Sequence, residues 1–181
     1  MKPAISTPAE FPKMYRTESG SSEAGRSRLN ALMNRRLASA VDLQTQMKQA
    51  RWNVRGPSLI GLHELFDTVY EAVGSYVDMI AERIVQLGGI AEGTARVAAS
   101  RSQLSEYPLQ TSDGLAHVDA VARALSTFGR EARQTIEEAA VLKDADTADL
   151  FTEISRGIDK WLWFIESYAR VTRQGLSSRR A

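Results

Sequence analysis

The sequence predicts an all-α fold, a four-helix bundle with a long crossover between its second and third helices. Apolar side chains recur every three or four residues in four long segments, and no segment shows the sustained alternation of a β-strand. A length of 181 residues suits a single domain that buries its own core. We expect the bundle to occupy residues 27–169, between a mobile N-terminal arm at 1–26 and a basic C-terminal tail at 170–181.

The arm and the first helix are expected to meet near residue 27. Residues 1–26 hold three of the five prolines and the run Ser19–Ser22, and they show no apolar periodicity. Helical spacing then begins, and Gly56-Pro57 ends it because a proline disfavours helical geometry at the residue before it. The apolar positions of this helix, interrupted once by Gln44, are Leu29, Met33, Leu37, Ala40 and Met47.

The second helix is predicted between two turn signals. Pro57-Ser58 provides a first-turn residue and a cap, and Gly88-Gly89 stops the helix. The apolar stripe between them predicts one buried face. Its members are Leu59, Leu62, Phe66, Val69, Val73, Val77, Ile80, Ile84 and Leu87.

A less regular connection follows, and we expect one short helix within it at 94–100 before Tyr107-Pro108 closes it. The third helix is predicted to start at Ser112, with Asp113 in its first turn. The fourth is predicted after the capping-box-like run Asp146–Asp149. Its apolar positions are Leu150, Ile154, Ile158, Trp161, Ile165 and Tyr168.

Charge is distributed unevenly although the net charge is only +1. Residues 1–28 carry five bases and three acids, and residues 170–181 carry four bases and no acid, which leaves −5 on residues 29–169. Basic ends suit a polyanion such as DNA, and an acidic body suits cations; the alternative is that the terminal charges only maintain solubility. The side chains expected to contact DNA are Lys2, Lys13, Arg16, Arg170, Arg173, Arg179 and Arg180.

Four side chains with metal-binding capability follow one stripe of the second helix: His63, Asp67, Asp78 and Glu82. At ~100° per residue they fall within ~100° of one another, beside the apolar stripe. Asp67 and Asp78 are ~16 Å apart along the axis, so one chain cannot close a site around one ion. The pairs 63/82 and 67/78 share a midpoint, so two antiparallel copies would bring them together, and Gly74 would allow a close crossing.

The alternative for this stripe is an ordinary solvated acidic face, since helical spacing of Asp and Glu is common. The shared midpoint and the histidine favour a metal site built across a dimer. The chain has no cysteine, which excludes thiolate ligands and disulfides. Oxygen ligands with one imidazole suit iron or manganese better than copper or structural zinc.

Several motifs, in order and at matching spacing over residues 29–167, resemble the Dps family of ferritin-like proteins. They are Lys48–Gly56, Leu62–Asp67, Asp78–Arg83, Val85–Gly89, Tyr107–Leu109, Asp146–Asp149, Ser155-Arg156 and Asp159–Phe164. The resemblance implies a ferritin-like bundle assembled as a hollow dodecamer. It also implies ferrous iron oxidised at sites between subunits with peroxide as oxidant, ferric mineral stored inside, and DNA bound through mobile tails.

Carried over by position, His63 and Asp67 match metal ligands from one subunit, Asp78 and Glu82 match ligands from its partner, and Trp52 matches the aromatic residue beside the site. Arg51 departs from the pattern, because members usually have a histidine there. An arginine has no lone pair to give a metal. We expect it to pair instead with Asp78 or Glu82 of the partner subunit and to weaken iron binding.

The resemblance also matches Asp144, Asp146 and Asp149 to the acidic mouth of a three-fold ion pore; the alternative is that they only serve the start of the last helix. Trp161 and Trp163 are expected to pack in the core or an interface. His117 is expected to be an ordinary polar residue.

Together these observations predict a cytoplasmic, iron-oxidising and iron-storing mini-ferritin that protects DNA, nucleoid-associated if DNA is bound. The N-terminus has no apolar run of the signal-peptide kind. The alternative function is a structural or DNA-binding cage whose ferroxidase centre is weakened or lost through Arg51.

Overall fold

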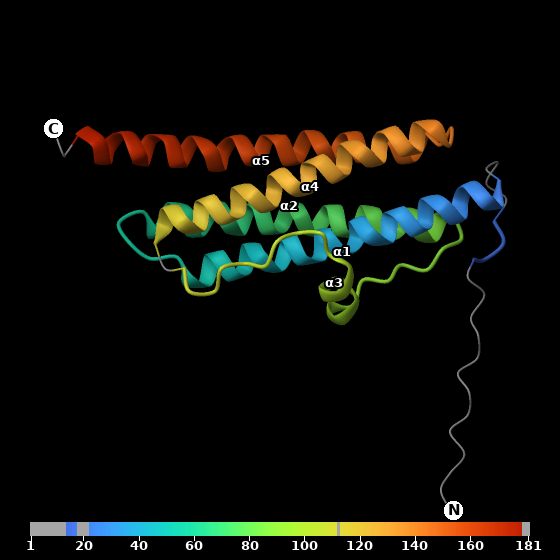
Figure 1. The fold of residues 1–181 in the computed structure, drawn as a ribbon, viewed down its shortest axis with the longest axis horizontal. Coiled ribbons are helices and arrows are strands. Elements are labelled where there is room, and N and C mark those ends of the chain that lie inside the picture. Colours follow the sequence, from blue (N-terminus) through green and yellow to red (C-terminus); the bar gives the residue numbers. More distant parts are fainter. Residues whose placement is uncertain (1–13, 18–21, 112, 179–181) are drawn as a thin grey trace, which may run out of the picture.

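The computed structural model describes residues 14–17, 22–111 and 113–178, and within them every regular element is a helix. Four long helices form the bundle and a short one lies in the crossover (Figure 1). None of them is long and apolar enough to span a membrane, as far as the described residues go. The helices are α1 (Glu23–Asn53), α2 (Leu59–Gln86), α3 (Ala95–Arg101), α4 (Gly114–Val141) and α5 (Ala145–Ser178).

The bundle consists of two antiparallel helix pairs. α1 packs along α2, and α4 packs along α5, with α1 and α4 in contact between the pairs. Residues 87–113 carry the chain from the end of α2 back along α1 to the start of α4 (Figure 1). The predicted four-helix bundle with a long crossover is therefore confirmed, and the predicted short helix is α3.

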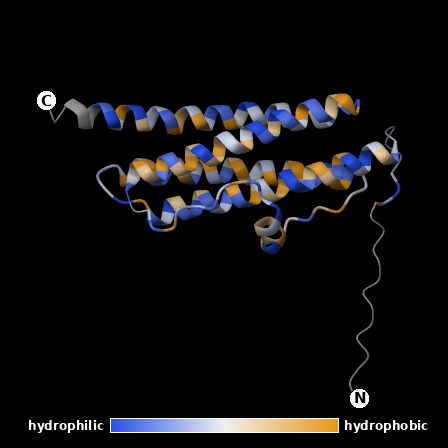
Figure 2. Ribbon diagram, viewed as in Figure 1, coloured by the Kyte–Doolittle hydropathy of each residue, from blue (hydrophilic) through white to orange (hydrophobic). Residues whose placement is uncertain are grey.

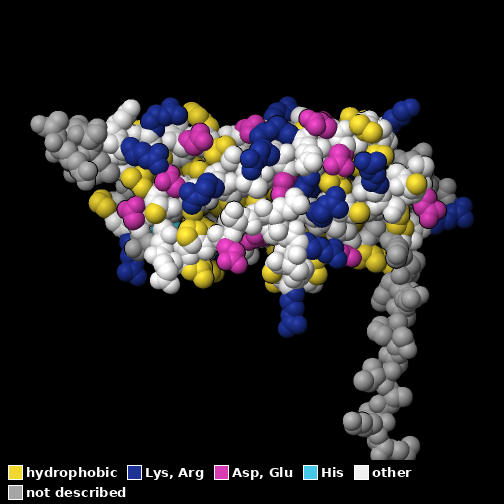
Figure 3. Space-filling model, viewed as in Figure 1, with side chains coloured by type: hydrophobic (Ala, Val, Ile, Leu, Met, Phe, Trp, Pro, Cys, Tyr) yellow, Lys and Arg dark blue, Asp and Glu magenta, His cyan; other side chains and the backbone are white. Residues whose placement is uncertain are grey.

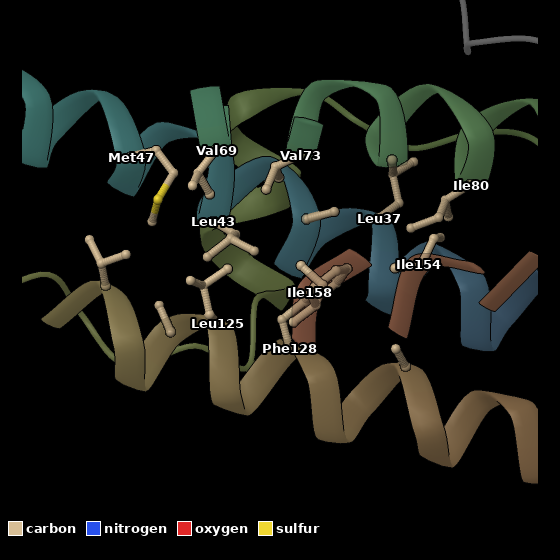
Figure 4. Packing of buried hydrophobic residues seen from close by; sticks show 14 of the residues in the cluster. Leu37, Leu43, Met47, Val69, Val73, Ile80, Leu125, Phe128, Ile154 and Ile158 are labelled. Carbon is tan, nitrogen blue, oxygen red and sulfur yellow. The ribbon is translucent and has the colours of Figure 1, made fainter. Parts of the chain in front are cut away.

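The core lies where the apolar faces of the four long helices meet. Leu37, Leu43 and Met47 of α1 lie in one cluster with side chains of α2, α4 and α5, among them Val73, Leu125 and Ile158 (Figure 4). Apolar and polar residues alternate around each long helix, as the helical period requires (Figure 2). The stripe predicted for α2 is buried except at its start and at Val77, because Leu59 is 41% exposed and Val77 is half-buried.

α1 is buried on a second, polar side as well. Asn34, Asp42 and Gln46 of this helix form hydrogen bonds with the crossover. They are eight and four residues apart, so they lie on one side of the helix and form a second stripe. Because these groups are satisfied by hydrogen bonds, they can be covered without a large desolvation penalty. Asn34 Nδ2 donates to the Ile90 carbonyl (3.0 Å), and its Oδ1 accepts from the Glu92 amide (2.9 Å). Ser102 Oγ donates to Asp42 Oδ2 (2.6 Å), and Gln46 Nε2 donates to the Ser105 carbonyl (3.1 Å).

Arg36 fastens the same side of α1 to α4. Its side chain is 3% exposed and lies 3.6 Å from the Glu131 carboxylate, which is 7% exposed. The guanidinium donates to Thr135 Oγ1 and Gln134 Oε1 of α4 and to Gln103 Oε1 of the crossover. Burial raises the pKa of Glu131, and Ser39 and Arg36 oppose that shift. Arg36 is thus the charge that compensates a buried carboxylate.

The start of α1 lies inside the segment predicted as an arm. The Ser22 hydroxyl accepts a hydrogen bond from the Gly25 amide (3.2 Å), and this cap starts the helix at Glu23 rather than near residue 27. Tyr15 N–H donates to the Gly88 carbonyl (2.6 Å). Gly88 has a φ of 80°, and a β-carbon there would lie 2.3 Å from the Tyr15 carbonyl oxygen, so this contact requires glycine. The rest of the predicted arm, 1–13 and 18–21, lies outside the described residues.

Three other boundaries differ from the sequence prediction. α5 continues to Ser178, so residues 170–178 belong to a helix, and 179–181 lie outside the described residues. Asp113 is the N-cap of α4 and accepts from the Ala116 amide (3.2 Å). Asp144, two residues before the predicted capping box, accepts from the Thr147 amide (2.9 Å) and starts α5. The starts of α4 and α5 are set by the residue whose side chain caps the helix, and the sequence near each start offers more than one residue able to do so.

Replacing Arg36 with alanine should lower the free energy of unfolding by about 3 kcal/mol, because Glu131 would stay buried without its counter-charge. Urea denaturation at one fixed protein concentration measures this change. The matched control is Arg35→Ala, a neighbouring but exposed arginine, for which we expect a change within about 0.5 kcal/mol. Equal losses for the two variants would contradict this assignment.

Candidate metal centre

The predicted ligands lie on one side of α2 but do not form a site within one chain. His63 and Asp67 are half-buried, and Asp78 and Glu82 are exposed farther along the helix. Across the described residues no three His, Asp or Glu side chains come close enough to share an ion. The four side chains therefore share one side of α2 without meeting, and whether they bind metal stays a prediction.

Asp67 is held by two cations from α1. Its Oδ1 lies 2.5 Å from Lys48 Nζ and 3.0 Å from Arg51 Nε. The Lys48 ammonium also sits over the ring of Tyr70, 3.9 Å from its centroid. The hydrogen bond from Lys48, with the charge of Arg51, lowers the pKa of Asp67. The carboxylate is therefore ionised and already neutralised by its own chain.

Arg51 faces a different carboxylate from the one expected. The sequence predicted a pair with Asp78 or Glu82 of the partner subunit; within its own chain the guanidinium of Arg51 lies against Asp67, and the contact with the partner stays a prediction. Position explains the difference, because Asp67 lies directly across the α1–α2 contact from Arg51. Arg51 Nε is buried and makes no well-aligned hydrogen bond within the described part of the chain, so the interaction is mainly ionic.

Gly74 also has a contact that the sequence did not predict. A β-carbon at this position would lie 2.6 Å from Nε2 of Gln44 on α1. Gly74 therefore admits a side chain of its own protomer beside the ligand stripe. Gln44, the polar break in the apolar stripe of α1, fills that space.

Comparison with known proteins decides the family. The ferritin-like domain family matches residues 30–174. The DNA protection during starvation protein of Agrobacterium fabrum is 36% identical over 158 residues, which cover 87% of this chain and 98% of that protein. This chain belongs to the Dps family of ferritin-like proteins.

Other Dps proteins support the same assignment. The DNA protection during starvation protein of Mycolicibacterium smegmatis is 29% identical over 168 residues, which cover 89% of this chain and 90% of that protein. Among solved structures, DpsA14 from Streptomyces coelicolor superposes with a TM-score of 0.82 at 29% identity, covering 86% of this chain and 92% of that one. The resemblance predicted from the motifs is confirmed.

The predicted ligands of this Dps chain are chemically suited to ferrous iron as a substrate, but position 51 holds an arginine in place of a histidine. One imidazole and three carboxylates are the oxygen-rich set that iron accepts. At position 51 the arginine adds a positive charge where the usual histidine would add a lone pair. A cation bound at Asp67 would therefore compete with Lys48 and Arg51.

The three acids matched to the pore of Dps proteins have different environments. Asp144 is buried, and its Oδ1 accepts from Arg83 Nη2 at 2.7 Å besides capping α5. Burial alone would raise the pKa of Asp144, but hydrogen bonds from Thr147 and Arg83 outweigh it and lower the pKa. Asp146, with a side chain 85% exposed, and Asp149 remain at the surface. Asp144 is a capping residue, and only the other two keep accessible carboxylates.

The basic residues expected to contact DNA are also not equivalent. Arg173 is bound to Asp119 of α4 through two hydrogen bonds of 2.7 and 2.9 Å. Arg16 and Arg170 are exposed, the latter on the last part of α5. Lys2, Lys13, Arg179 and Arg180 lie outside the described residues. On the face shown in Figure 3, acidic and basic side chains are interspersed rather than gathered by sign.

The tryptophans lie at the end of α1 and in an aromatic cluster on α5. Trp52, 67% exposed, projects from the last turn of α1 next to Arg51. On α5, Phe164 contacts Trp161, which packs against the core, and Trp163, which is 59% exposed. His117, predicted as an ordinary polar residue, is fully buried and bonded to Tyr107. The helical position of His117, on the apolar side of α4 one turn before Val121, was the signal that could have found it.

Replacing Asp144 with alanine should cost about 3 kcal/mol of unfolding free energy, because it removes a helix cap and the partner of half-buried Arg83. The low folded-state pKa makes this contribution complete above the ordinary aspartate pKa of about 3.9, and it is lost as the pH falls through the folded-state value. Urea denaturation at neutral and acidic pH measures both effects. Asp146→Ala is the control and should change stability by less than about 0.5 kcal/mol; a comparable loss there would refute the distinction.

Proposed function

We propose that this chain is an iron-oxidising and iron-storing mini-ferritin that protects DNA by consuming ferrous iron and peroxide together. The observation that carries the proposal is the divided ligand set on α2. His63 and Asp67 sit toward one end, while Asp78 and Glu82 are exposed toward the other, and no described residues complete either half. A second, antiparallel copy supplies the missing half of each site.

The chemistry follows from the ligands. Carboxylates stabilise the higher charge of ferric iron more than that of ferrous iron, so binding favours oxidation. Two ferrous ions side by side can pass two electrons to one peroxide, which avoids release of a radical. Exposed Asp146 and Asp149 are suited to attract cations toward an assembled cage.

The relatives support this function through their names. The Agrobacterium fabrum and Mycolicibacterium smegmatis proteins are both named DNA protection during starvation proteins, and each aligns with most of this chain. By analogy we propose a cytoplasmic dodecamer built from two-fold dimers, with mineral inside. The two-fold dimer is the unit that the metal site requires.

A second candidate function is a cage with a closed centre that acts by binding DNA. One specific observation favours it: Lys48 and Arg51 both engage Asp67, at 2.5 and 3.0 Å. With both in place, the two cations offset two of the three carboxylate charges of a completed site. We propose that iron still binds and is oxidised, but more weakly than with a histidine at position 51.

Calorimetric titration with ferrous iron under argon tests this ranking. Arg51→His removes a competing charge and adds an imidazole, so we expect about tenfold tighter binding. The matched control is Arg55→His, which changes an exposed arginine on the same segment and should leave the affinity unchanged.

Adding peroxide to the iron-loaded cage then separates the two candidate functions. Ferric absorbance should rise in the natural protein and faster in Arg51→His. No ferric product in the natural protein, together with a restored reaction in the variant, would establish the closed centre. No iron binding by either protein would overturn the metal site.

We also propose non-specific DNA binding through the chain ends. Deleting residues 1–13 and 179–181 removes Lys2, Lys13, Arg179 and Arg180 without cutting α1 or α5. Gel shifts across a salt series should show weaker binding and a shallower salt dependence, because each lost phosphate contact lowers the slope by about 0.9. The control replaces the exposed bundle residues Arg96 and Arg156 with glutamine. Unchanged retardation of the truncated protein would refute binding through these ends.

A further inference from the structure

Gln44 of α1 places its amide over Gly74 of α2, beside the ligand stripe. A β-carbon at position 74 would lie 2.6 Å from Gln44 Nε2, which is too close for any side chain. The Gln44 amide therefore occupies the place that a side chain of residue 74 would take. It is half-buried, and within the described residues it has no hydrogen-bond partner.

Glu71 is an exposed carboxylate three residues before Gly74 on the same helix. Its side chain has neither a hydrogen-bond nor an ion-pair partner in the part of the chain that the structure describes. On the wheel of α2, Glu71 lies ~80° and Gly74 ~20° from His63, so both fall inside the ~100° of the ligand stripe. The Glu71 carboxylate and the Gln44 amide therefore face the same surface as the predicted ligands.

Positions 71 and 74 are the innermost pair of the symmetric stripe. Their midpoint lies between residues 72 and 73, as do the midpoints of the pairs 63/82 and 67/78. Positions 71 and 74 are each ~2 Å from that midpoint along the axis, whereas positions 67 and 78 are each ~8 Å away. In two antiparallel copies of α2 centred there, position 71 of one copy meets position 74 of the other. Glycine has no side chain to offer at that point, but the Gln44 amide already lies over it.

We propose that Gln44 donates a hydrogen bond to Glu71 of the partner subunit, twice about the two-fold axis, and so sets the register of the dimer. The inference rests on the proposed function for its antiparallel dimer. An amide that donates to a carboxylate forms a charge-assisted hydrogen bond, which is stronger than one between neutral groups. It also offsets the repulsion between the two Glu71 carboxylates that the axis brings near each other.

Register matters because the metal site tolerates little displacement. A slip of one residue moves facing ligands ~1.5 Å past each other, far more than the ~0.2 Å by which metal-ligand bonds vary. Gln44 is thus a positioning residue, which acts on the site only through the alignment of the two chains.

Exchanging the two side chains across the contact tests it. Gln44→Glu sets a carboxylate against the partner's Glu71, so the protein concentration at which the assembly half-dissociates should rise about tenfold or more. The double variant Gln44→Glu/Glu71→Gln restores one amide against one carboxylate and should return that concentration to within about twofold of the natural value. Gln110→Glu adds the same charge at an exposed position of the crossover and is the control. Analytical ultracentrifugation of a dilution series at neutral pH measures the change.

Gly74→Ala gives an independent check. Alanine is the better helix former, so the isolated helix gains stability. The new β-carbon takes the place of the Gln44 amide, however, so assembly should weaken severalfold, as in Gln44→Ala. Unchanged assembly in both variants would overturn the contact, and so would a double variant that does no better than Gln44→Glu.

A covalent measurement keeps the contact testable if a charged variant fails to fold. The chain has no cysteine, so introduced thiols react without background. In Gln44→Cys/Glu71→Cys a short bis-maleimide should join two subunits, and peptide mapping should identify the link as 44 to 71. Gln110→Cys/Glu71→Cys is the control and should give no link from 110 to 71. Absence of the 44 to 71 link between subunits would overturn the contact.

Iron binding separates this inference from the proposed function. Neither Gln44 nor Glu71 is a predicted ligand, so Gln44→Glu should weaken ferrous iron binding severalfold and Gln44→Glu/Glu71→Gln should restore it. Iron binding by the natural protein, without this rescue and without the link, would overturn the contact and leave the proposed function intact. No iron binding by the natural protein, with rescue of assembly by the double variant, would overturn the proposed function and support the contact.

Discussion

The burial of α1 on two sides is the constraint on which the rest of the structure depends. One side supplies apolar residues such as Leu37 and Leu43 to the core, and the other supplies Asn34, Asp42 and Gln46 to the crossover. Because both of these sides of α1 are covered, only its remaining surface can carry side chains of a functional site. The charged residues of the candidate centre, Lys48 and Arg51, lie on that surface beside α2. Their positions are fixed because α1 cannot rotate without breaking either the core or the crossover contacts.

Electrostatics at Asp67 then decides how the metal site behaves. The charge of the Asp67 carboxylate is already compensated by the Lys48 ammonium and the Arg51 guanidinium of its own chain. The cost is competition, since an incoming cation must displace at least part of this arrangement. The exposed indole of Trp52 follows Arg51 on the last turn of α1.

Much of the fold was predictable from local patterns. The apolar stripe from Leu62 to Leu87, the stops at Gly56-Pro57 and Gly88-Gly89, and the short helix in the crossover all matched the structure, because periodicity and turn residues act over a few positions. Two of the boundary errors lie where neighbouring residues offered the same capping chemistry. Asp144 rather than the Asp146–Asp149 run starts α5, and Asp113 caps α4 rather than lying inside it. Local sequence does not choose between such neighbours; the packing of the helices does.

The sequence by itself determined that His63, Asp67, Asp78 and Glu82 follow one stripe of a helix, because the helical period alone places them there and keeps the two pairs too far apart to share one ion within a chain. It also determined that Arg51 cannot be a metal ligand, which follows from the chemistry of guanidinium. Tertiary structure alone decided that Arg51 and Lys48 share Asp67, that Arg36 compensates Glu131, and that Tyr107 meets His117. Most of these contacts join separate elements, and their partners depend on the register in which the elements pack.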